Sequence, residues 1–534
     1  MTSPLGSRFA SVLVGVAALT AGLLVAPSAQ AHDHRPDQHS DHRKLAPRTH
    51  FTLAPDGSSG LRADGAGIPN IDSVKSTIRT YYGDTGTGIA DKQRSPYISQ
   101  MERIVQREER GLATAYRKAV RHGKKPALVF DADDTTLWTY DMEAGAMNFV
   151  YDPVLQDQWV QDERFPATPA MVDFVNSAAR MGFAIFGITG RNDDQKAATL
   201  ANLSKVGYTG FRSDRFFTKW TGKGDSTQPG YITCATSSCT TVEYKALTRR
   251  HIERHGYDIV QNWGDQWSDL QGGYADKPVK LPNPTYYLPS PDLPGVHEPW
   301  LTPRTHFTML PDGSSGRIPD GDGIPNIDSV KATIRTYYGD TGNGISDKDE
   351  SPYITDVTKI IRRNAGPVLQ QCRVESRRHN RPAIVLDADD TTLWTYDMEA
   401  GAMNFVYDPS LQDEWVQAEK FPATPAMVDF VNAAHRAGCT LIGLTGRNAG
   451  QKAATLGNLS AVGYEGFTDA NYYTKQPGDS RSTIDYKSQT RAYVESDAGG
   501  DYDIVANFGD QYSDLIGGHA DRTVKLPNPT YYLP

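Results

Sequence analysis

The sequence has 534 residues, of which 38% are hydrophobic and 22% are charged. This balance is ordinary for globular proteins and excludes both wholesale disorder and a polytopic membrane protein. The 55 Lys and Arg residues stand against 64 Asp and Glu residues, and the net charge of −9 argues against a general binder of nucleic acid or anionic membranes. Four cysteines are too few for a disulfide-built scaffold.

The N-terminus has the pattern of a secretory signal peptide. A single charge, Arg8, precedes an apolar run from Phe9 to Ala26, and an A-x-A cleavage site follows at residues 29–31. We therefore expect residues 1–31 to be removed and the protein to be secreted. An uncleaved anchor is the less favoured alternative, because polar residues and glycines interrupt the run and a span needs ~20 strongly apolar residues.

An internal repeat divides the rest of the chain into two copies. Pro47 to Thr52 recur as Pro303 to Thr308, 256 positions later (303 minus 47). This period is far longer than that of solenoid repeats, so each copy is expected to be a whole domain. The predicted divisions are a His-rich flexible tail at 32–46, copy 1 at 47–289, a Pro-rich linker at 290–302 and copy 2 at 303–534. Metal binding by the histidines of the tail is the less favoured alternative to a solvated tail.

Within each copy the pattern predicts alternating strands and helices. The apolar runs Ala127–Phe130 and Phe183–Ile188 are typical of strands buried on both faces of a parallel sheet, and Tyr257–Val260 is interpreted as a third strand. Helical patterns lie between them at Pro169–Arg180 and Asp194–Lys205. The alternation predicts an α/β fold with a doubly wound sheet, in which ligands bind beyond the C-terminal ends of the strands.

An acidic run, DADDTT at residues 131–136, follows the first predicted strand directly. Asp131 and Asp133 can point into one crevice if the chain turns there. Such a pair suits metal-assisted phosphoryl chemistry, in which one carboxylate attacks phosphorus and the other handles the leaving-group proton. A simple acidic turn is the alternative, because aspartate is common in turns and at helix N-caps.

Further polar residues follow the later strands. Thr189 and Gly190 offer a hydroxyl donor and close backbone approach to a phosphate oxygen. Lys245, at the start of a helical stretch, can act as a point charge on a phosphoryl group. If a helix begins after Gly264, then Asp265 and Asp269 share a face and would join the first acidic pair as hard oxygen ligands suited to Mg²⁺. The same elements recur in copy 2 as Asp387, Asp389, Thr445, Gly446, Lys487, Asp510 and Asp514.

The ordered set D-x-D-x-T, T-G-R, a lysine and G-D-x-x-x-D resembles the haloacid dehalogenase-like superfamily of phosphatases. The stretches DADDTTLWTYD, GITGR, VEYK, GDQWSDL and KLPNPTYYLP are similar to its secreted acid phosphatase subfamily, which includes plant acid phosphatases and vegetative storage proteins. The resemblance covers nearly the whole of each copy. It implies a tandem duplication of a Rossmann-like parallel-sheet domain, each copy with a small helical cap.

The resemblance also implies roles for single residues. Asp131 and Asp387 would be nucleophiles that form an aspartyl-phosphate, and Asp133 and Asp389 would protonate the leaving alcohol and later activate water. The phosphate-binding residues would be Thr189, Gly190, Lys245, Thr445, Gly446 and Lys487. The Mg²⁺ ligands would be Asp131, Asp133 through its backbone carbonyl, and Asp265 with Asp269 beside it, and likewise Asp387, Asp389, Asp510 and Asp514.

The implied function is a secreted Mg²⁺-dependent acid phosphatase with two active sites per chain. Its partner would be a small phosphomonoester, with neither nucleic acid nor a membrane involved after signal cleavage. A non-catalytic storage or binding protein is the alternative, which we consider less favoured because both copies keep every named chemical group. A phosphohistidine mechanism is disfavoured, because the R-H-G sequence at 121–123 has Arg378 in place of His122 in copy 2.

Three further features of the sequence are its cysteines, an aromatic stretch after the first acidic run and an acidic segment in copy 2. Cys234 and Cys239 lie close enough for a local disulfide, whereas free thiols are the alternative; the pairing of Cys372 and Cys439 stays open. The aromatic and Met-rich stretch from Trp138 to Phe165 is interpreted either as a lid over the site or as ordinary core. The acidic segment 320–328 resembles a calcium loop, but we favour a polar turn because no glutamate stands at the closing position.

Overall fold

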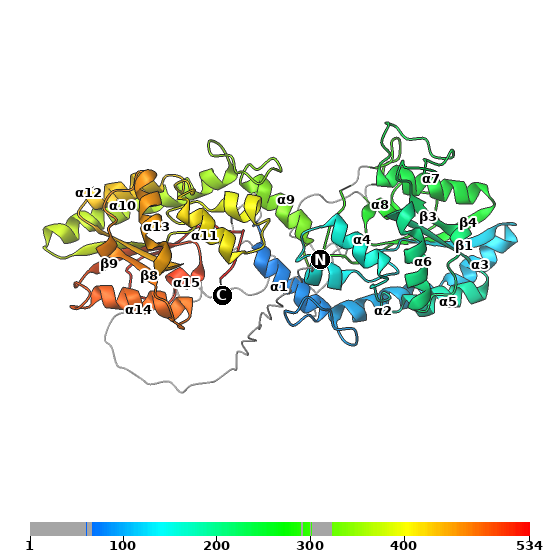
Figure 1. Ribbon diagram of the computed structural model, residues 1–534, viewed down its shortest axis with the longest axis horizontal. Helices are drawn as coiled ribbons and strands as arrows, with labels where there is room; N and C mark the ends of the chain where they lie inside the picture. Colours follow the sequence, from blue (N-terminus) through cyan, green and yellow to red (C-terminus); the bar gives the residue numbers. More distant parts are fainter. Residues whose placement is uncertain (1–59, 61–66, 290–291, 299–300, 302–322, 534) are drawn as a thin grey trace, which may run out of the picture. The chain divides into compact units, whose positions relative to one another are not determined.

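The computed structural model describes residues 60, 67–289, 292–298, 301 and 323–533 (Figure 1). These residues belong to one compact unit, Leu45–Pro534. The predicted signal peptide, the His-rich tail and residues 320–322 of the acidic segment lie outside the described residues. Among the described helices, none combines the length and the apolar character that a membrane crossing requires.

Each copy contains one five-stranded sheet in which all neighbouring strands are parallel. The order is β3-β2-β1-β4-β5 in copy 1 and β10-β9-β6-β7-β8 in copy 2, so each sheet is wound in both directions from its first strand. The strands are β1 Lys125–Phe130, β2 Ala184–Asn192, β3 Phe216–Lys219, β4 Tyr257–Gly264, β5 Pro278–Lys280, β6 Pro382–Leu386, β7 Thr440–Asn448, β8 Tyr472–Lys475, β9 Asp503–Gly509 and β10 Thr523–Lys525. The predicted α/β fold, in two tandem copies, is confirmed.

The helices of the two copies follow the same order with one exception. Copy 1 has α1 Ile71–Tyr82, α2 Pro96–Glu109, α3 Leu112–Arg121, α4 Pro153–Gln161, α5 Met171–Met181, α6 Lys196–Lys205, α7 Thr241–Arg254 and α8 Trp267–Leu270. Copy 2 has α9 Ile327–Tyr337, α10 Pro352–Arg377, α11 Pro409–Gln417, α12 Met427–Arg436, α13 Lys452–Ala461, α14 Thr483–Glu495 and α15 Tyr512–Leu515. The single helix α10 therefore takes the place of α2 and α3. Two short π-helices are η1 Asp141–Ala146 and η4 Asp397–Ala402. The short 3₁₀-helices are η2 Asp193–Gln195, η3 Ser213–Arg215, η5 Ala449–Gln451 and η6 Asp469–Asn471.

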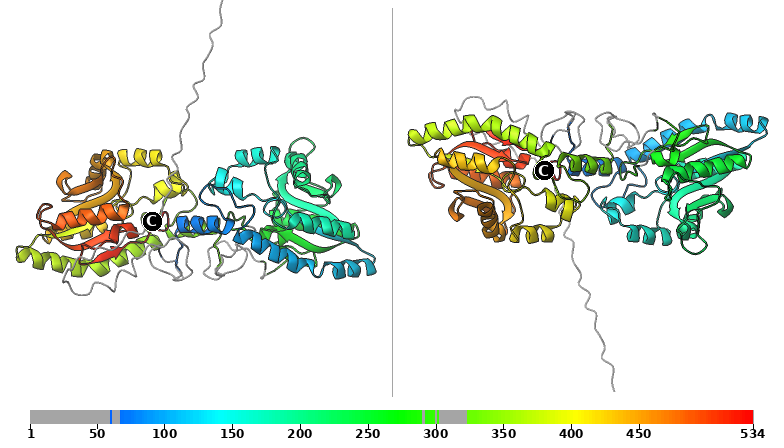
Figure 2. Two further views of the ribbon diagram at one scale, coloured as in Figure 1. Left: turned by 90° about the horizontal axis from the view of Figure 1, so that it is seen from below. Right: turned by 90° about the horizontal axis from the view of Figure 1, so that it is seen from above.

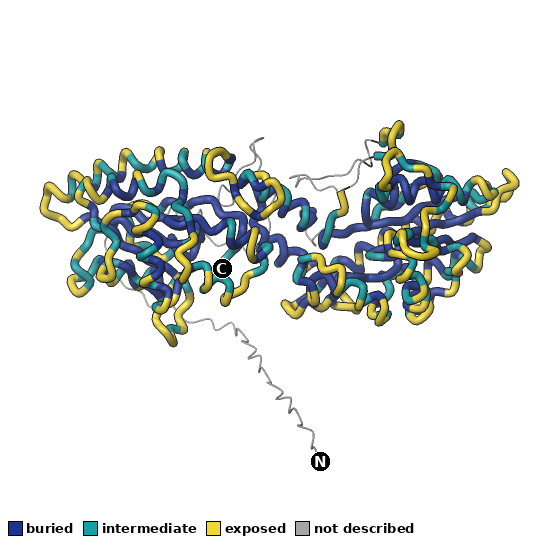
Figure 3. The backbone as a smooth tube through the Cα atoms, turned by 45° about the horizontal axis from the view of Figure 1, so that its top comes forward, coloured by how far each residue is buried: buried dark blue, intermediate teal, exposed yellow. Residues whose placement is uncertain are grey.

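Helices cover both faces of each sheet (Figure 2). Alternate residues of β1 face opposite ways, so Val129 packs with α7 residues such as Leu247 while Leu128 packs with α5 residues such as Phe174. The strands are consequently the most deeply buried part of each copy, and the exposed residues gather on helices and loops (Figure 3). Burial on both faces explains the apolar runs at Ala127–Phe130 and Phe183–Ile188 in the sequence.

The cap of copy 1 is inserted between β1 and α5 and consists of η1 and α4. The predicted lid residues divide into two groups. Met142 and Phe149 line the pocket described below, whereas Trp138 and Tyr140 belong to the core, where Tyr140 stacks on Tyr82 with 4.1 Å between the ring centroids. All four side chains belong to the buried hydrophobic cluster, as the core interpretation expected, and a lid role for the pocket residues stays a prediction.

Both cysteine pairs form disulfides. Cys234–Cys239 closes a local loop in copy 1, as favoured from the sequence, and Cys372–Cys439 joins α10 to the start of β7 in copy 2. His122 lies at the end of α3, where its Nδ1 contacts the Lys118 carbonyl at 2.8 Å, consistent with a basic connection into β1 rather than with a nucleophile.

Candidate active site

Asp131 and Asp269 converge on one buried ammonium group. Lys245, on α7, donates to Asp131 Oδ1 at 2.7 Å and to Asp269 Oδ1 at 2.6 Å, and all three side chains are at least 90% buried. Burial opposes the charge on Lys245, but the two carboxylates outweigh it and raise the pKa of the ammonium. The predicted lysine is therefore a cation placed at the carboxyl ends of β1 and β4.

The predicted acidic cluster forms, although not by the expected route. Carboxylate oxygens of Asp131, Asp265 and Asp269 lie within 4.8 Å of one another. The prediction that Asp265 and Asp269 share a helix face was wrong, because α8 begins only at Trp267 and has four residues. Asp269 instead folds back and accepts a hydrogen bond from the Gln266 N–H at 2.9 Å. Gly264 makes room for this fold, since a Cβ there would lie 2.3 Å from Asp269 Cβ.

Charge repulsion within the cluster suits it to a cation. Burial and neighbouring carboxylates raise the pKa of Asp131, and burial with Asp269 and Asp134 raises the pKa of Asp265 to about 7. One lysine does not offset this many carboxylates, so a divalent cation would relieve the excess negative charge. Ser268 Oγ, beside the cluster, is buried and has no hydrogen-bond partner among the described residues. The donor set of hard oxygens fits a metal such as Mg²⁺.

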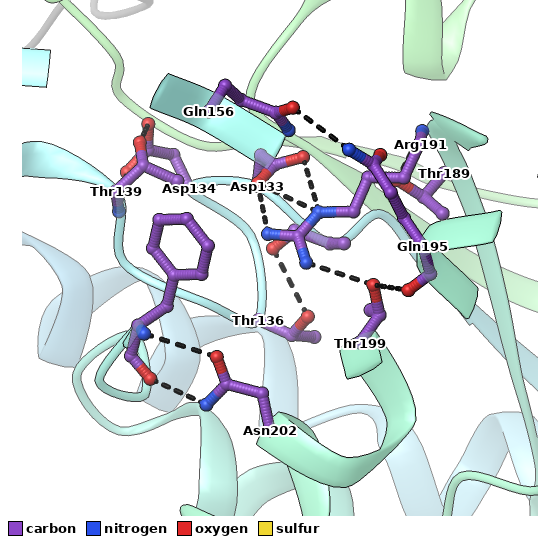
Figure 4. A network of polar contacts seen from close by, with 12 residues as sticks. Asp133, Asp134, Thr136, Thr139, Gln156, Thr189, Arg191, Gln195, Thr199 and Asn202 are labelled. Atoms are coloured by element: carbon purple, nitrogen blue, oxygen red, sulfur yellow. Dashed lines mark hydrogen bonds and ion pairs between the residues drawn. The ribbon is translucent and has the colours of Figure 1, made fainter. Parts of the chain in front are cut away.

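An arginine holds the carboxylate of Asp133 (Figure 4). Arg191 Nη2 donates to Asp133 Oδ1 at 2.6 Å, and Nε lies 3.1 Å from Oδ2. The Arg191 side chain is 1% exposed and also donates to Thr199 Oγ1 at 3.0 Å, whereas Asp133 stays 25% exposed. The bidentate pair fixes the orientation of the Asp133 carboxylate at the mouth of the pocket. Both Asp133 carboxylate oxygens are thus bonded to Arg191, whereas the carboxylates that converge on one point are those of Asp131, Asp265 and Asp269.

Thr189 and Gly190 lie at the end of β2. Thr189 is buried, and its Oγ1 accepts a hydrogen bond from the Arg191 N–H at 3.2 Å, which leaves its hydroxyl hydrogen for another acceptor. Gly190 lines the pocket and is exposed, and a Cβ at this position would meet open space. Gly190 is therefore placed at the site, although its backbone does not itself require glycine. Thr189 is not among the described residues that line the copy 1 pocket and lies one position before Gly190.

Asp134 and Glu143 also belong to the site and, like Arg191, were not identified from the sequence. Asp134, the third carboxylate of the acidic run, has φ 47° and accepts hydrogen bonds from the Thr139 N–H at 3.0 Å and the Thr139 hydroxyl at 2.5 Å. It is 1% exposed and stabilises the loop from Asp134 to Thr139, directly after the two predicted catalytic aspartates. Glu143, from η1, lines the pocket; burial and the Asp134 carboxylate raise its pKa.

The closing segment, which we define as residues 281–288, holds Asp265 in place. The Asn283 side chain donates to Asp265 Oδ2 at 2.8 Å, and the Tyr286 hydroxyl donates to the same oxygen at 3.1 Å. Thr285 and Leu288 line the pocket with Tyr286. The segment thus acts as a wall of the site and as a support for a candidate metal ligand.

Copy 2 repeats this geometry. Lys487 donates to Asp387 Oδ1 at 2.7 Å and to Asp514 Oδ1 at 2.5 Å, and Arg447 Nη2 donates to Asp389 Oδ1 at 2.6 Å. The carboxylates of Asp387, Asp510 and Asp514 form the second cluster, and Thr445 and Gly446 line its pocket. The pockets have volumes of about 420 Å³ in copy 1 and about 430 Å³ in copy 2. Within the residues that the structure describes, each copy carries one of two equivalent candidate sites.

A family model described as HAD superfamily, subfamily IIIB (Acid phosphatase) matches residues 90–289 and 331–534. The chain belongs to this acid phosphatase family. Each match contains one complete set of the residues described above, so the resemblance expected from the motifs is confirmed in both copies.

Individual relatives are moderately similar to the chain. The stem 28 kDa glycoprotein of Glycine max is 35% identical over 168 residues, which are 31% of this chain and 61% of the relative, and acid phosphatase 1 of Solanum lycopersicum is 31% identical over 183 residues, which are 33% of this chain and 65% of the relative. The chain thus spans less than two thirds of the length of either. The structure of the class C acid phosphatase from Bacillus anthracis aligns with 20% identity and a TM-score of 0.29, covering 40% of this chain and 86% of that one.

Proposed function

We propose that the chain is an acid phosphatase that hydrolyses phosphomonoesters at two active sites, one in each copy. The observation that supports this most is that two aspartates from one loop are held differently in one pocket. Asp131 lies against the Lys245 ammonium at the base, and Asp133 lies on the Arg191 guanidinium at the mouth. One carboxylate is placed for attack on phosphorus and the other for proton transfer.

In the proposed reaction the Asp131 carboxylate attacks phosphorus, and the P–O bond to the leaving alcohol breaks as the aspartyl-phosphate forms. Asp133 gives its proton to the leaving oxygen, so a neutral alcohol departs. Asp133 then takes a proton from water, and the water oxygen attacks phosphorus. The P–O bond to Asp131 breaks, which releases inorganic phosphate and returns both aspartates to their starting states. Lys245 and the Thr189 hydroxyl would hold the phosphoryl oxygens during both steps.

The proposal includes Mg²⁺ as the cofactor. Asp131, Asp265 and the Asp133 backbone carbonyl would hold the ion, with Asp269 next to it. When bound, a divalent cation offsets the repulsion between the phosphate dianion and the carboxylates. Its removal by a chelator is expected to abolish turnover, and added Mg²⁺ is expected to restore it.

Secretion is a further part of the proposal. The sequence pattern of residues 1–31 and the two disulfides both suit an oxidising compartment outside the cytosol. Mass spectrometry of the protein recovered from culture medium would test it, and the expected N-terminal residue is His32.

The decisive experiment measures hydrolysis of p-nitrophenyl phosphate between pH 4 and 8 with Mg²⁺ present. Asp131→Asn and Asp387→Asn are each expected to leave the other site working, and the double variant is expected to lose turnover. The matched control is the Asp173→Asn/Asp429→Asn protein, which changes equivalent exposed aspartates on α5 and α12. Absence of hydrolysis by the unmodified protein would favour a storage role, and full activity of the double nucleophile variant would refute the assignment.

A further inference from the structure

The first helix of copy 1 begins against the closing segment of copy 2, which is residues 526–533. Asn70 caps α1, because its side-chain oxygen accepts hydrogen bonds from the Asp72 and Ser73 N–H groups. The amide nitrogen of the same side chain donates to the carbonyls of Asn528 at 3.1 Å and Tyr531 at 2.6 Å. One asparagine therefore caps its own helix and holds the other copy.

The equivalent contacts also form from copy 2 to copy 1. Asn326 caps α9 and donates to the carbonyls of Asn283 at 3.0 Å and Tyr286 at 2.6 Å, in the closing segment of copy 1. Helices α1 and α9 are in contact, and their buried side chains share one hydrophobic cluster. These side chains are Ile71, Val74, Ile78, Ile327, Val330 and Ile334. The exchange is reciprocal, as in a twofold dimer interface, but it lies within one chain.

The segment that the other copy holds is the one that supports Asp265. Asn283 donates its side-chain N–H to Asp265 while its carbonyl accepts from Asn326. Tyr286 does the same with its hydroxyl and its carbonyl. The position of a candidate metal ligand in copy 1 thus depends on the first helix of copy 2.

A carboxylate of the other copy also reaches each pocket. Asp328, in the first turn of α9, lines the copy 1 pocket, and its side chain is 37% exposed. Its Oδ2 accepts a hydrogen bond from the Tyr287 N–H at 3.1 Å, and Oδ1 lies 3.3 Å from Lys331 Nζ. Lys331 in turn donates to the carbonyl of Phe149, another pocket residue. Asp72 lines the copy 2 pocket in the same way.

The chemistry of Asp328 suits a leaving group rather than a phosphoryl group. A carboxylate repels a phosphate dianion and only accepts hydrogen bonds. Each carboxylate oxygen can accept two, and each oxygen of Asp328 has one protein partner in the part of the chain that the structure describes. Acceptor capacity therefore remains for hydroxyl or ammonium hydrogens on the organic part of a substrate.

We propose that each active site is completed by the other copy, with Asp328 as a specificity-determining residue of the copy 1 site and Asp72 as one of the copy 2 site. Both favour phosphomonoesters whose leaving group carries hydrogen-bond donors, either hydroxyl or ammonium. This inference rests on the proposed phosphatase function and deepens it. It requires the two copies to act as one enzyme rather than as two linked ones.

The test measures one site at a time in the full chain. In the Asp131→Asn background only the copy 2 site turns over, and kcat/KM is measured for glycerol 1-phosphate and O-phosphoethanolamine, each relative to donor-free propyl phosphate. Adding Asp72→Asn, a change in copy 1, is expected to lower at least one of these ratios about tenfold, because the acceptor loses its charge and one of its two accepting oxygens becomes a donor. The two substrates distinguish hydroxyl from ammonium recognition. The matched control is Asp173→Asn, an exposed aspartate in the first turn of α5.

Unchanged ratios for both substrates would overturn the proposal. So would a fall in the ratios of the copy 1 site on Asp72→Asn, measured in the Asp387→Asn background, because the residue would then act within its own copy. Calorimetric binding of the same three esters to the inactive Asp131→Asn/Asp387→Asn protein gives a readout that needs no turnover. In that protein, the combined Asp72→Asn and Asp328→Asn changes are expected to weaken binding of a donor-bearing ester about tenfold relative to propyl phosphate. Equal weakening of all three esters would contradict the role of these two aspartates in specificity.

Discussion

Replacement of Arg191 by methionine tests how Asp133 is positioned. The change keeps much of the side-chain volume but removes two charge-assisted hydrogen bonds to Asp133, at 2.6 and 3.1 Å. Such bonds contribute about 1.5–3 kcal/mol each, and because Asp133 is 25% exposed we count only one of them at full value. If the carboxylate must be fixed to transfer its proton, this energy corresponds to a fall in kcat of about 10-fold to 150-fold.

The assay is kcat for p-nitrophenyl phosphate in the Asp387→Asn background, so that only the copy 1 site is observed. Arg191→Lys is the informative companion, because it keeps the charge but not the planar fork, and an intermediate rate is expected. Esters with a poorer leaving group should suffer more than the aryl ester, since they depend more on the donated proton. Wild-type kcat in Arg191→Met, with the same dependence on the leaving group, would refute the positioning role.

Three further predictions concern stability and metal binding. Because burial and nearby carboxylates raise the pKa of Glu143 above 4.5, the folded state favours its protonated form, and the free energy of unfolding falls as pH rises from 4.5 through the folded pKa. Glu143→Gln should therefore raise the melting temperature at pH 8 but not at pH 4, and equal effects at both pH values would contradict this. Loss of the Cys372–Cys439 disulfide, which spans 67 residues, should lower the free energy of unfolding by about 4 kcal/mol, because it closes a long loop. Loss of Cys234–Cys239, which spans five residues, should lower it by about 2 kcal/mol. Chemical denaturation of the two double Cys→Ala variants would show whether this order holds. Mg²⁺ should raise the melting temperature of the chelator-treated protein, and it should raise that of the Asp265→Asn/Asp510→Asn variant much less. An equal rise in both proteins would show that Asp265 and Asp510 are not metal ligands.

The sequence was sufficient to predict the elements that depend on local pattern. Strands β1, β2 and β4 each contain a short apolar run because helices cover both faces of the sheet, and the catalytic candidates lie at or directly after the C-terminal ends of these strands. The edge strands β3 and β5 have four and three residues and were not predicted. An edge strand has one neighbouring strand, and such short segments carry too little apolar pattern to be recognised.

The site residues that were missed act through contacts distant in sequence. Arg191 reaches Asp133 across 58 positions, and Asn326 reaches Asn283 across 43. Neither residue type identifies its partner, because arginine and asparagine are common at surfaces and helix caps. Asp134 was visible in the sequence, but its role depends on φ 47°, which no spacing reveals. The error in placing Asp265 on a helix came from spacing alone, which does not distinguish a short capped turn from a longer helix.

The central claim is that Asp131 and Asp387 each form an aspartyl-phosphate, one in each active site. It is tested most directly by quenching the working enzyme with sodium borohydride, which reduces an aspartyl-phosphate to homoserine, and by locating the modified residue by peptide mass spectrometry. Asp133→Asn/Asp389→Asn protein should accumulate the intermediate, because the group that activates water is absent. We expect homoserine at positions 131 and 387 and at no other aspartate. Turnover with no modification at either position, or with phosphate on another residue, would contradict the account.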